Sequence, residues 1–176
     1  MNMNLNINNM YKTIKKINCN KELNNSDLKI LDSILEGKKY NIKFIDFNTC
    51  LQISSLYDYK SENKVKWLFV AEEKYNITIE NTYLCILYYN IGKYYYIHNI
   101  FDFSFDNLNI AIKYFNKASN RLSNSYYYLG CIYLILEVSK KKDERDYKKS
   151  YKYFKIAVDN KVREAFENEK LVKRLL

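Results

Sequence analysis

Over most of the chain, apolar residues recur every three to four positions, the spacing that places them on one face of an α-helix. Seven segments with this pattern predict helices near residues 44–58, 62–75, 79–96, 107–119, 123–138, 146–159 and 162–175. No run approaches the ~18 uncharged apolar residues of a membrane span. We therefore expect an all-α protein that makes no contact with a membrane.

The first 24 residues are rich in asparagine. Their apolar and polar residues alternate with a period of two, which would fit a strand, but codon bias explains the alternation more simply. We interpret residues 1–24 as a polar, partly disordered lead-in. This segment also lacks the basic start and apolar stretch of a secretory leader, so we expect an intracellular protein that is not secreted.

A short accessory helix is predicted within residues 25–43. Ser26 and Asp27 are of the types that cap the start of a helix, and Gly37 is of the type that ends one. Between them, one helical face is formed by Leu28, Leu31, Ile34 and Leu35. Residues 44–176 then remain for repeated helices.

The strongest signal is a motif that occurs three times: Lys, an aromatic residue, an apolar residue, any two residues and Ala. The copies are Lys66-Trp-Leu-Phe-Val-Ala71, Lys113-Tyr-Phe-Asn-Lys-Ala118 and Lys152-Tyr-Phe-Lys-Ile-Ala157. A small residue, Ala111 or Ser150, precedes the aromatic by three places in the second and third copies. Because small side chains let a neighbouring helix approach while large ones fill the groove beside it, each copy predicts one helix of a packed pair.

A second helical pattern lies between the last two copies. A common stripe is formed by Tyr126, Leu129, Gly130 and Tyr133. We expect this stripe to face the paired helix, with Gly130 at the closest approach, since glycine inside a helix costs ~1 kcal/mol relative to alanine. The corresponding segment upstream, 83–89, has no Leu-Gly pair, and Gly92 falls later than the pattern predicts. Helix pairs that recur every ~35–45 residues are typical of an α-solenoid.

These residues resemble the Sel1-like repeat, a relative of the tetratricopeptide repeat. The segment from Asp146 to Ala157 is similar to the second helix of that repeat, with Ser150 in place of the usual alanine. Leu129-Gly130 and Tyr133 are similar to the first helix. The resemblance is clear over residues 105–170, looser over 44–104 and absent before that.

The resemblance implies antiparallel helix pairs, about three of them, stacked as a short right-handed α-solenoid. It also implies a scaffold that binds proteins and carries no active site. A charged loop at 139–145 departs from the Gly-rich turn usual between the two helices. The last segment, 163–176, would be a capping helix with a polar outer face formed by Glu164, Glu167, Glu169, Lys170, Lys173 and Arg174.

Composition narrows the class further. The 176 residues are 48% hydrophobic and include no proline and three glycines, which excludes a disordered chain and a turn-rich all-β fold. The excess of Asn, Lys, Ile and Tyr is typical of A+T-rich genomes, such as those of large DNA viruses and some protists. Because this bias inflates lysine, the net charge of +9 is weak support for a nucleic-acid partner. For a viral source we expect the host cytoplasm and a host protein as partner.

Residues suited to catalysis or cofactor binding are few. His98 is the only histidine, which excludes a His-rich metal site, and Glu72 and Glu73, as helix neighbours, point ~100° apart. No glycine-rich phosphate-binding motif occurs. We expect no enzyme, no cofactor and no metal site. The widely spaced cysteines are interpreted as buried apolar residues rather than a disulfide or metal framework: Cys19, Cys50, Cys85 and Cys131.

Two stretches could contact a partner. The lysine-rich stretch 140–149 mixes both charge signs and is interpreted as a solvated loop. Three consecutive tyrosines cannot all face a helix core, so at least one of Tyr94–Tyr96 and one of Tyr126–Tyr128 should be exposed or half-exposed. Such tyrosines suit a protein interface, although codon bias alone would also place them there.

Two functions of different class remain open. The leading prediction is a protein–protein interaction scaffold whose concave face, lined by the first helices, binds a partner segment. The alternative is an RNA-binding helical repeat protein whose tyrosines stack on bases. Residues 82–92 and 122–136 hold no charged side chain, which favours a protein partner over nucleic acid. From the helix geometry, five residues are predicted to bind the partner: Tyr83, Leu87, Asn90, Tyr127 and Leu134.

Overall fold

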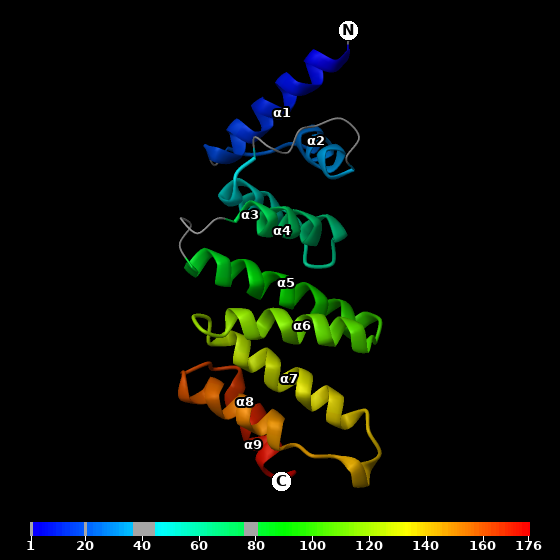
Figure 1. The fold of residues 1–176 in the computed structure, drawn as a ribbon, viewed down its shortest axis with the longest axis vertical. Helices are drawn as coiled ribbons and strands as arrows, with labels where there is room; N and C mark the ends of the chain where they lie inside the picture. Colours follow the sequence, from blue (N-terminus) through cyan, green and yellow to red (C-terminus); the bar gives the residue numbers. More distant parts are fainter. Residues whose placement is uncertain (1, 20, 37–44, 76–80) are drawn as a thin grey trace. The chain divides into compact units, whose positions relative to one another are not determined.

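The computed structural model describes residues 2–19, 21–36, 45–75 and 81–176 of the chain, and within these ranges it is all-helical, as predicted. The elements are α1 (Asn2–Asn18), α2 (Asn25–Leu35), α3 (Phe47–Ser55), α4 (Glu62–Lys74), α5 (Asn81–Phe101), α6 (Phe105–Ala118), α7 (Asn124–Val138), η2 (Lys142–Glu144), α8 (Lys148–Asp159) and α9 (Ala165–Lys173) (Figure 1). None of these helices combines the length and apolar character that a membrane crossing requires. The chain forms two compact units, residues 1–77 and 78–176, so α3 and α4 belong with α1 and α2.

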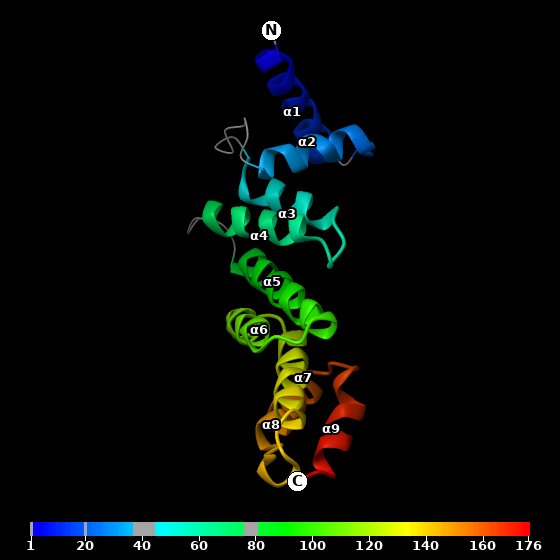
Figure 2. The same ribbon diagram turned by 90° about the vertical axis from the view of Figure 1, so that its right-hand side faces the viewer.

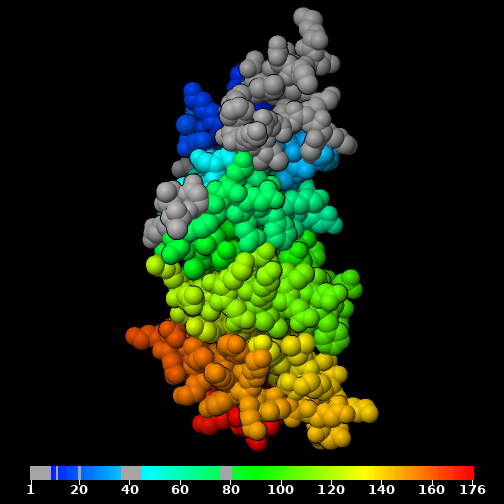
Figure 3. Space-filling view, viewed as in Figure 1, coloured from blue at the N-terminus to red at the C-terminus, as the bar shows by residue number. Residues whose placement is uncertain are grey.

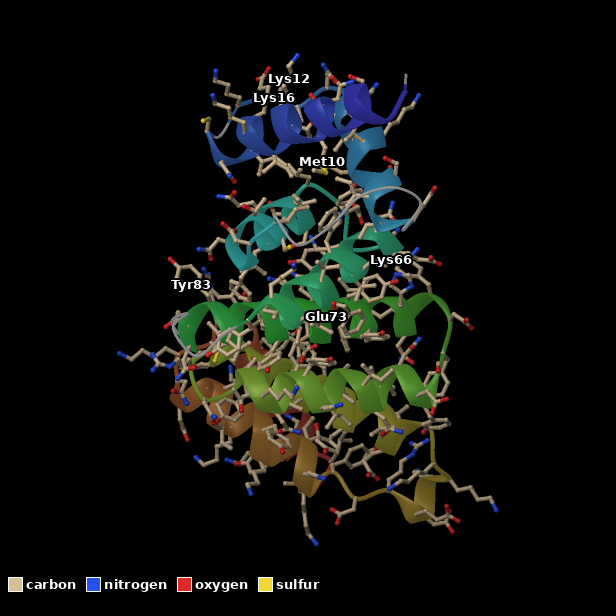
Figure 4. The ribbon with its side chains drawn as sticks, turned by 45° about the horizontal axis from the view of Figure 1, so that its top comes forward. Met10, Lys12, Lys16, Lys66, Glu73 and Tyr83 are labelled. Carbon is tan, nitrogen blue, oxygen red and sulfur yellow. The ribbon has the colours of Figure 1, made fainter. Side chains whose placement is uncertain are left out.

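Helix α1 corrects the prediction of a partly disordered lead-in at residues 1–24. Its buried side chains recur at helical spacing: Met10, Thr13, Ile14 and Ile17. Met10 and Lys12 lie on opposite sides of the helix (Figure 4), and α1 packs against α2 and α3. Asparagine is a poor helix former, but burial of an apolar face stabilises the helix more than these propensities destabilise it.

Helix α2 has its N-cap two to three residues before Ser26 and Asp27, the predicted cap residues. The cap is Asn24, whose side-chain oxygen accepts hydrogen bonds from the backbone N–H groups of Ser26 and Asp27. The Asp27 carboxylate accepts a bond from the Asn24 N–H in return, at 3.0 Å, which completes a capping box. The predicted end of this helix at Gly37 lies outside the described residues.

Asp27 also ties α2 to α1. Its carboxylate accepts hydrogen bonds from the Thr13 hydroxyl at 2.8 Å and from Lys16 Nζ at 2.7 Å. Burial opposes ionisation of this carboxyl, but the hydrogen bonds from Lys16, Asn24 and Thr13 outweigh it and lower the pKa of Asp27. The charged carboxylate is therefore the form that holds the two helices together.

The first copy of the repeated motif lies on α4, and its three anchor residues, Trp67, Leu68 and Ala71, are fully buried, as predicted. Lys64 occupies the position that Ala111 and Ser150 hold in the other copies. Its aliphatic stem is buried, and its Nζ donates to the carbonyl oxygens of Ser54 and Tyr57, at 3.0 Å each. The lysine thus satisfies carbonyl groups at the C-terminal end of α3.

In the second unit, α5 packs against α6 and α7 packs against α8 (Figure 1). The anchor residues of both remaining copies are fully buried at the predicted positions: Ala111, Phe115 and Ala118 on α6, and Ser150, Phe154 and Ala157 on α8. The predicted register of these second helices is therefore confirmed.

Gly130 marks the closest approach of α7 to α8, as predicted. A Cβ atom added to it would lie 2.7 Å from Cδ1 of Phe154. The Ser150 hydroxyl, also buried in this contact, donates to the Gly130 carbonyl oxygen at 2.9 Å. Tyr133 likewise faces α8, where its ring stacks on Tyr153. Leu129 instead belongs to a core cluster with Phe115 of α6, so the predicted stripe contacts two different helices.

Gly92 is the counterpart of Gly130, which corrects the prediction that it falls too late in the chain. A Cβ atom at Gly92 would lie 3.1 Å from the ring of Phe115, just as Gly130 meets Phe154. Ile91 before it is fully buried, like Leu129. The same contact therefore occurs within each helix pair: a glycine on the first helix leaves room for a phenylalanine ring from the second.

The turn from α8 to α9 has a left-handed residue where glycine is usual. Lys161 has φ 62°, and its N–H donates to the Val158 carbonyl at 2.8 Å while the Val162 N–H donates to the Ala157 carbonyl at 2.9 Å. These two bonds form a Schellman motif, in which the residue at this position must turn left-handed. Val162 is buried against Phe154 and Ala157, which fixes the turn.

Helix α9 runs beside α7 and α8 (Figure 2) and is shorter than the predicted capping helix. Its predicted polar residues are exposed except for Glu169, which is half-buried. The outer face is less polar than predicted, because large apolar side chains are exposed there too: Phe166, Leu171, Leu175 and Leu176.

The charged loop after α7 is ordered by its own side chains. Arg145 donates to the carbonyl oxygens of Val138 and Lys140, at 3.0 and 3.1 Å, and so satisfies groups at the end of α7. The Glu137 carboxylate accepts bonds from Lys140 Nζ and the Asp146 N–H. The three lysines at 140–142 remain exposed, in agreement with a solvated loop.

Candidate protein-binding surface

The five residues predicted to bind a partner do not form one open surface. Tyr83, in the first turn of α5 (Figure 4), is 46% exposed. Leu87 is fully buried, so its predicted surface position is wrong. Asn90 is half-buried, and its side-chain NH₂ donates to the Ile86 carbonyl oxygen at 3.0 Å, one turn earlier on the same helix. Of the three residues on α5, Tyr83 alone presents a large area to solvent.

Tyr127 and Leu134 are half-buried under the last two helices. The Tyr127 ring lies 6.0 Å from the ring of Phe154, centroid to centroid, and its hydroxyl is hydrogen-bonded to Asn168 of α9. Leu134 packs on the cluster that contains Phe154 and Val172. Both side chains therefore have a structural role in holding α7 to α8 and α9, and their role in binding stays a prediction.

The alignment of Gly92 with Gly130 shows which residues the sequence analysis missed. Thirty-eight residues separate the two glycines, so the counterpart of Tyr127 on α5 is Tyr89. Tyr89 and Ile86 line a cavity of about 350 Å³ together with residues of the α6–α7 turn: Arg121, Leu122, Ser123 and Asn124. Aligning the glycines rather than the apolar runs would have identified Tyr89 from sequence.

This cavity is called here the Tyr89 cavity. Hydrogen bonds hold its polar side chains in place. The Tyr89 hydroxyl is hydrogen-bonded to Tyr128 and to the Asn124 side chain, and burial raises its pKa, so it is neutral at physiological pH. Arg121 Nη1 donates to the Thr82 hydroxyl at 3.3 Å, which holds the guanidinium beside the start of α5. Asn124 is the first residue of α7, where the helix dipole adds partial positive charge. The cavity therefore offers hydrogen-bond donors and one cationic side chain, Arg121, above an apolar wall.

Behind the Tyr89 cavity, tyrosines join the two helix pairs. The Tyr128 ring stacks on Phe115 at 5.0 Å and meets the edges of Tyr89 and Tyr96. Burial raises the pKa of Tyr127 to about 12, and interaction with Cys131 contributes. Each tyrosine trio contains half-buried members, as predicted, because Tyr95, Tyr96 and all of Tyr126–Tyr128 are half-buried. Through its ring contacts with Phe115 and Tyr128, the Tyr89 side of the cavity packs against this aromatic cluster.

Among the described residues, no three His, Cys, Asp or Glu side chains converge as a metal site would require. His98 packs its ring 4.2 Å from that of Tyr94 at the end of α5. Cys50 and Cys85 are buried and Cys131 is half-buried, but Cys19 is exposed, which corrects the prediction that it is a buried thiol. Burial raises the pKa of the Cys131 thiol, which disfavours its thiolate form.

Compared with protein-family models, with curated proteins and with solved structures, the chain shows no match. The resemblance to the Sel1-like repeat therefore depends on the motif residues described above.

Proposed function

We propose that this chain is a protein–protein interaction scaffold whose helix pairs stack as a short Sel1-like α-solenoid, and that a partner segment binds in the Tyr89 cavity. The observation that carries this proposal is the repeated contact of Gly92 with Phe115 and of Gly130 with Phe154. Equivalent helix pairs related in this way are the unit from which α-solenoids are built, and such proteins bind partners on extended concave surfaces.

The chemistry of the cavity indicates the kind of segment that fits. Ile86, Leu122 and the Tyr89 ring suit an apolar side chain, while Arg121 and Asn124 suit a carboxylate. A volume of about 350 Å³ is at the lower end of ligand-binding pockets, which suits one or two side chains of an extended segment. We therefore propose a partner segment in which an acidic residue stands next to an apolar one, from a host protein if the source is viral.

The alternative, an RNA-binding repeat protein, has weaker support. A groove that follows a phosphate backbone requires several cations. The first helices, α5 and α7, carry two charged side chains at neutral pH, and only one of them, Lys93, is a cation; the other is Glu137. Arg121 is a single additional cation at the cavity.

Site-specific photocrosslinking in the native host cell tests the proposal. A photoreactive phenylalanine analogue replaces Tyr83, one turn before Ile86, and in the matched control it replaces Asn116, which is exposed on α6. We expect one protein to be crosslinked from position 83 and not from position 116, and the crosslink to survive nuclease treatment. Equal crosslinking from both positions would contradict the proposed surface, and an RNA crosslinked from position 83 would support the alternative.

A further inference from the structure

The turn between α5 and α6 exposes a dense group of large apolar side chains. Ile100 is 61% exposed, Phe101 65%, Phe103 52% and Phe105 54%, all within six residues. The rings of Phe103 and Phe105 meet edge to face, with centroids 4.9 Å apart. The turn, in green, reaches the surface at the right-hand edge of the view (Figure 3). Exposed apolar groups gathered in this way mark interaction sites on soluble domains.

Hydrogen bonds hold this turn in one conformation. The side-chain oxygen of Asn99, a buried residue, accepts a hydrogen bond from the Ser104 N–H at 2.8 Å. The Ser104 hydroxyl in turn accepts a bond from the Asn107 N–H and caps α6. The Asp102 N–H donates to the His98 carbonyl oxygen at 3.0 Å. The aromatic rings are thus presented by an ordered turn, which reduces the entropy lost on binding.

The charge of the turn is opposite to that of the chain. Asp102 and Asp106 are both exposed and stand beside the exposed rings. No lysine or arginine occurs between Lys93 and Lys113, although the chain has 29 such residues and a net charge of +9. This local charge repels phosphate groups and anionic lipid headgroups and attracts a basic surface.

We propose that residues 100–106 are a docking site for a basic, amphipathic protein segment whose apolar side chains cover the phenylalanine rings while its lysines or arginines pair with Asp102 and Asp106. The site shares no residue with the Tyr89 cavity and does not depend on the proposed function. If both sites are used, the chain connects two partners of opposite charge.

The test measures fluorescence anisotropy of the full-length chain with a labelled 18-residue peptide of leucine and lysine, patterned as an amphipathic helix. A matched peptide has glutamate in place of lysine. We expect the leucine–lysine peptide to bind, and the double variant Phe103→Ser, Phe105→Ser to bind it about tenfold or more weakly. Asp102→Asn with Asp106→Asn should weaken binding and reduce its salt dependence. Phe166→Ser, which removes a 43% exposed ring from α9, serves as the control and should bind like the wild type.

Circular dichroism confirms that each variant is folded, so that loss of binding is not loss of structure. The proposal is overturned if the leucine–lysine peptide does not bind, if the leucine–glutamate peptide binds equally well, or if the double serine variant keeps full affinity. It is also overturned if the variant instead abolishes binding to phosphatidylcholine vesicles or self-association in sedimentation, since the turn would then dock on a membrane or on a second copy.

Discussion

Gly130 lies directly against the ring of Phe154, so that a Cβ atom at this position would come within 2.7 Å of Cδ1. The Ser150 hydroxyl donates to the carbonyl oxygen of the same glycine. The Phe154 ring therefore leaves no room for a side chain at position 130 of α7. The contact makes the glycine a requirement of packing, although glycine is unfavourable for helix formation.

Gly130→Ala should destabilise the protein by about 1–3 kcal/mol, because the added methyl group forces the Phe154 ring out of its place. Gly92→Ala is the matched comparison. There the Cβ would lie 3.1 Å from Phe115, and the ~1 kcal/mol gain in helix propensity offsets much of the strain, so a smaller loss is expected. Urea unfolding followed by circular dichroism measures both. Equal stability of Gly130→Ala and the wild type would show that α7 and α8 are farther apart than described.

Phe154→Ala should cost about 3–5 kcal/mol, since it removes a fully buried ring between α7, α8 and α9. Phe166→Ala, on the exposed side of α9, should change stability by less than about 1 kcal/mol. Thermal unfolding of both variants gives the comparison. An unchanged melting temperature for Phe154→Ala would mean that the register of α8 is wrong.

Lys161→Gly should stabilise the protein by about 1 kcal/mol, because glycine adopts the left-handed conformation at φ 62° without the steric cost that a Cβ atom brings. Lys161→Ala is the control, since it removes the charge and keeps the Cβ atom, and it should leave stability nearly unchanged. Chemical denaturation of the three proteins at one pH decides the matter. A Lys161→Gly protein less stable than Lys161→Ala would contradict the Schellman turn.

Asp27 should make the stability of the first unit depend on acid pH. Its pKa is lowered in the folded state, so its contribution is complete above the unfolded pKa of ~3.9 and is lost as the pH falls through the lower, folded value. Asp27→Asn should reduce stability at pH 7 by about 1–3 kcal/mol and remove part of the decrease below pH 4. Melting curves from pH 2 to pH 7 provide the measurement. Parallel curves for variant and wild type would contradict an ionised, hydrogen-bonded Asp27.

Tyr83→Ala and Arg121→Gln should each weaken binding of the crosslinked partner, by about tenfold for Arg121, with little change in melting temperature because both residues are exposed. Tyr127→Ala should lower the melting temperature as well, since its ring packs on Phe154. Isothermal titration with the purified partner separates the two effects. A partner that binds Arg121→Gln at full strength would exclude the Tyr89 cavity, and a fall of several orders of magnitude between 50 and 200 mM salt would favour RNA.

The second helices α6 and α8 were predictable from sequence because in each a small residue is followed three and four positions later by aromatic ones, as in Ala111 with Phe115. Helix α1 was not, since its asparagines obscure the face that contains Met10 and Ile17. The buried position of Leu87 and the half-buried position of Tyr127 depend on contacts with other helices, which the periodicity of one helix does not contain. The Tyr89 cavity combines α5 with a turn more than thirty residues away, so only the folded chain brings its residues together.

Helix α7 packs against both α6 and α8, which limits where the chain could be shortened or extended by a repeat. On one side Leu129 and Ile132 join the cluster around Phe115, and on the other Cys131 and Leu134 join the cluster around Phe154. A shortened chain whose last helix was α7 would leave the face with Cys131 and Leu134 uncovered. A shortened chain whose first helix was α7 would leave the face with Leu129 and Ile132 uncovered. The helices after α6 therefore cannot be removed or exchanged as an independent unit. A shortened chain would need polar substitutions on the newly exposed face to avoid aggregation.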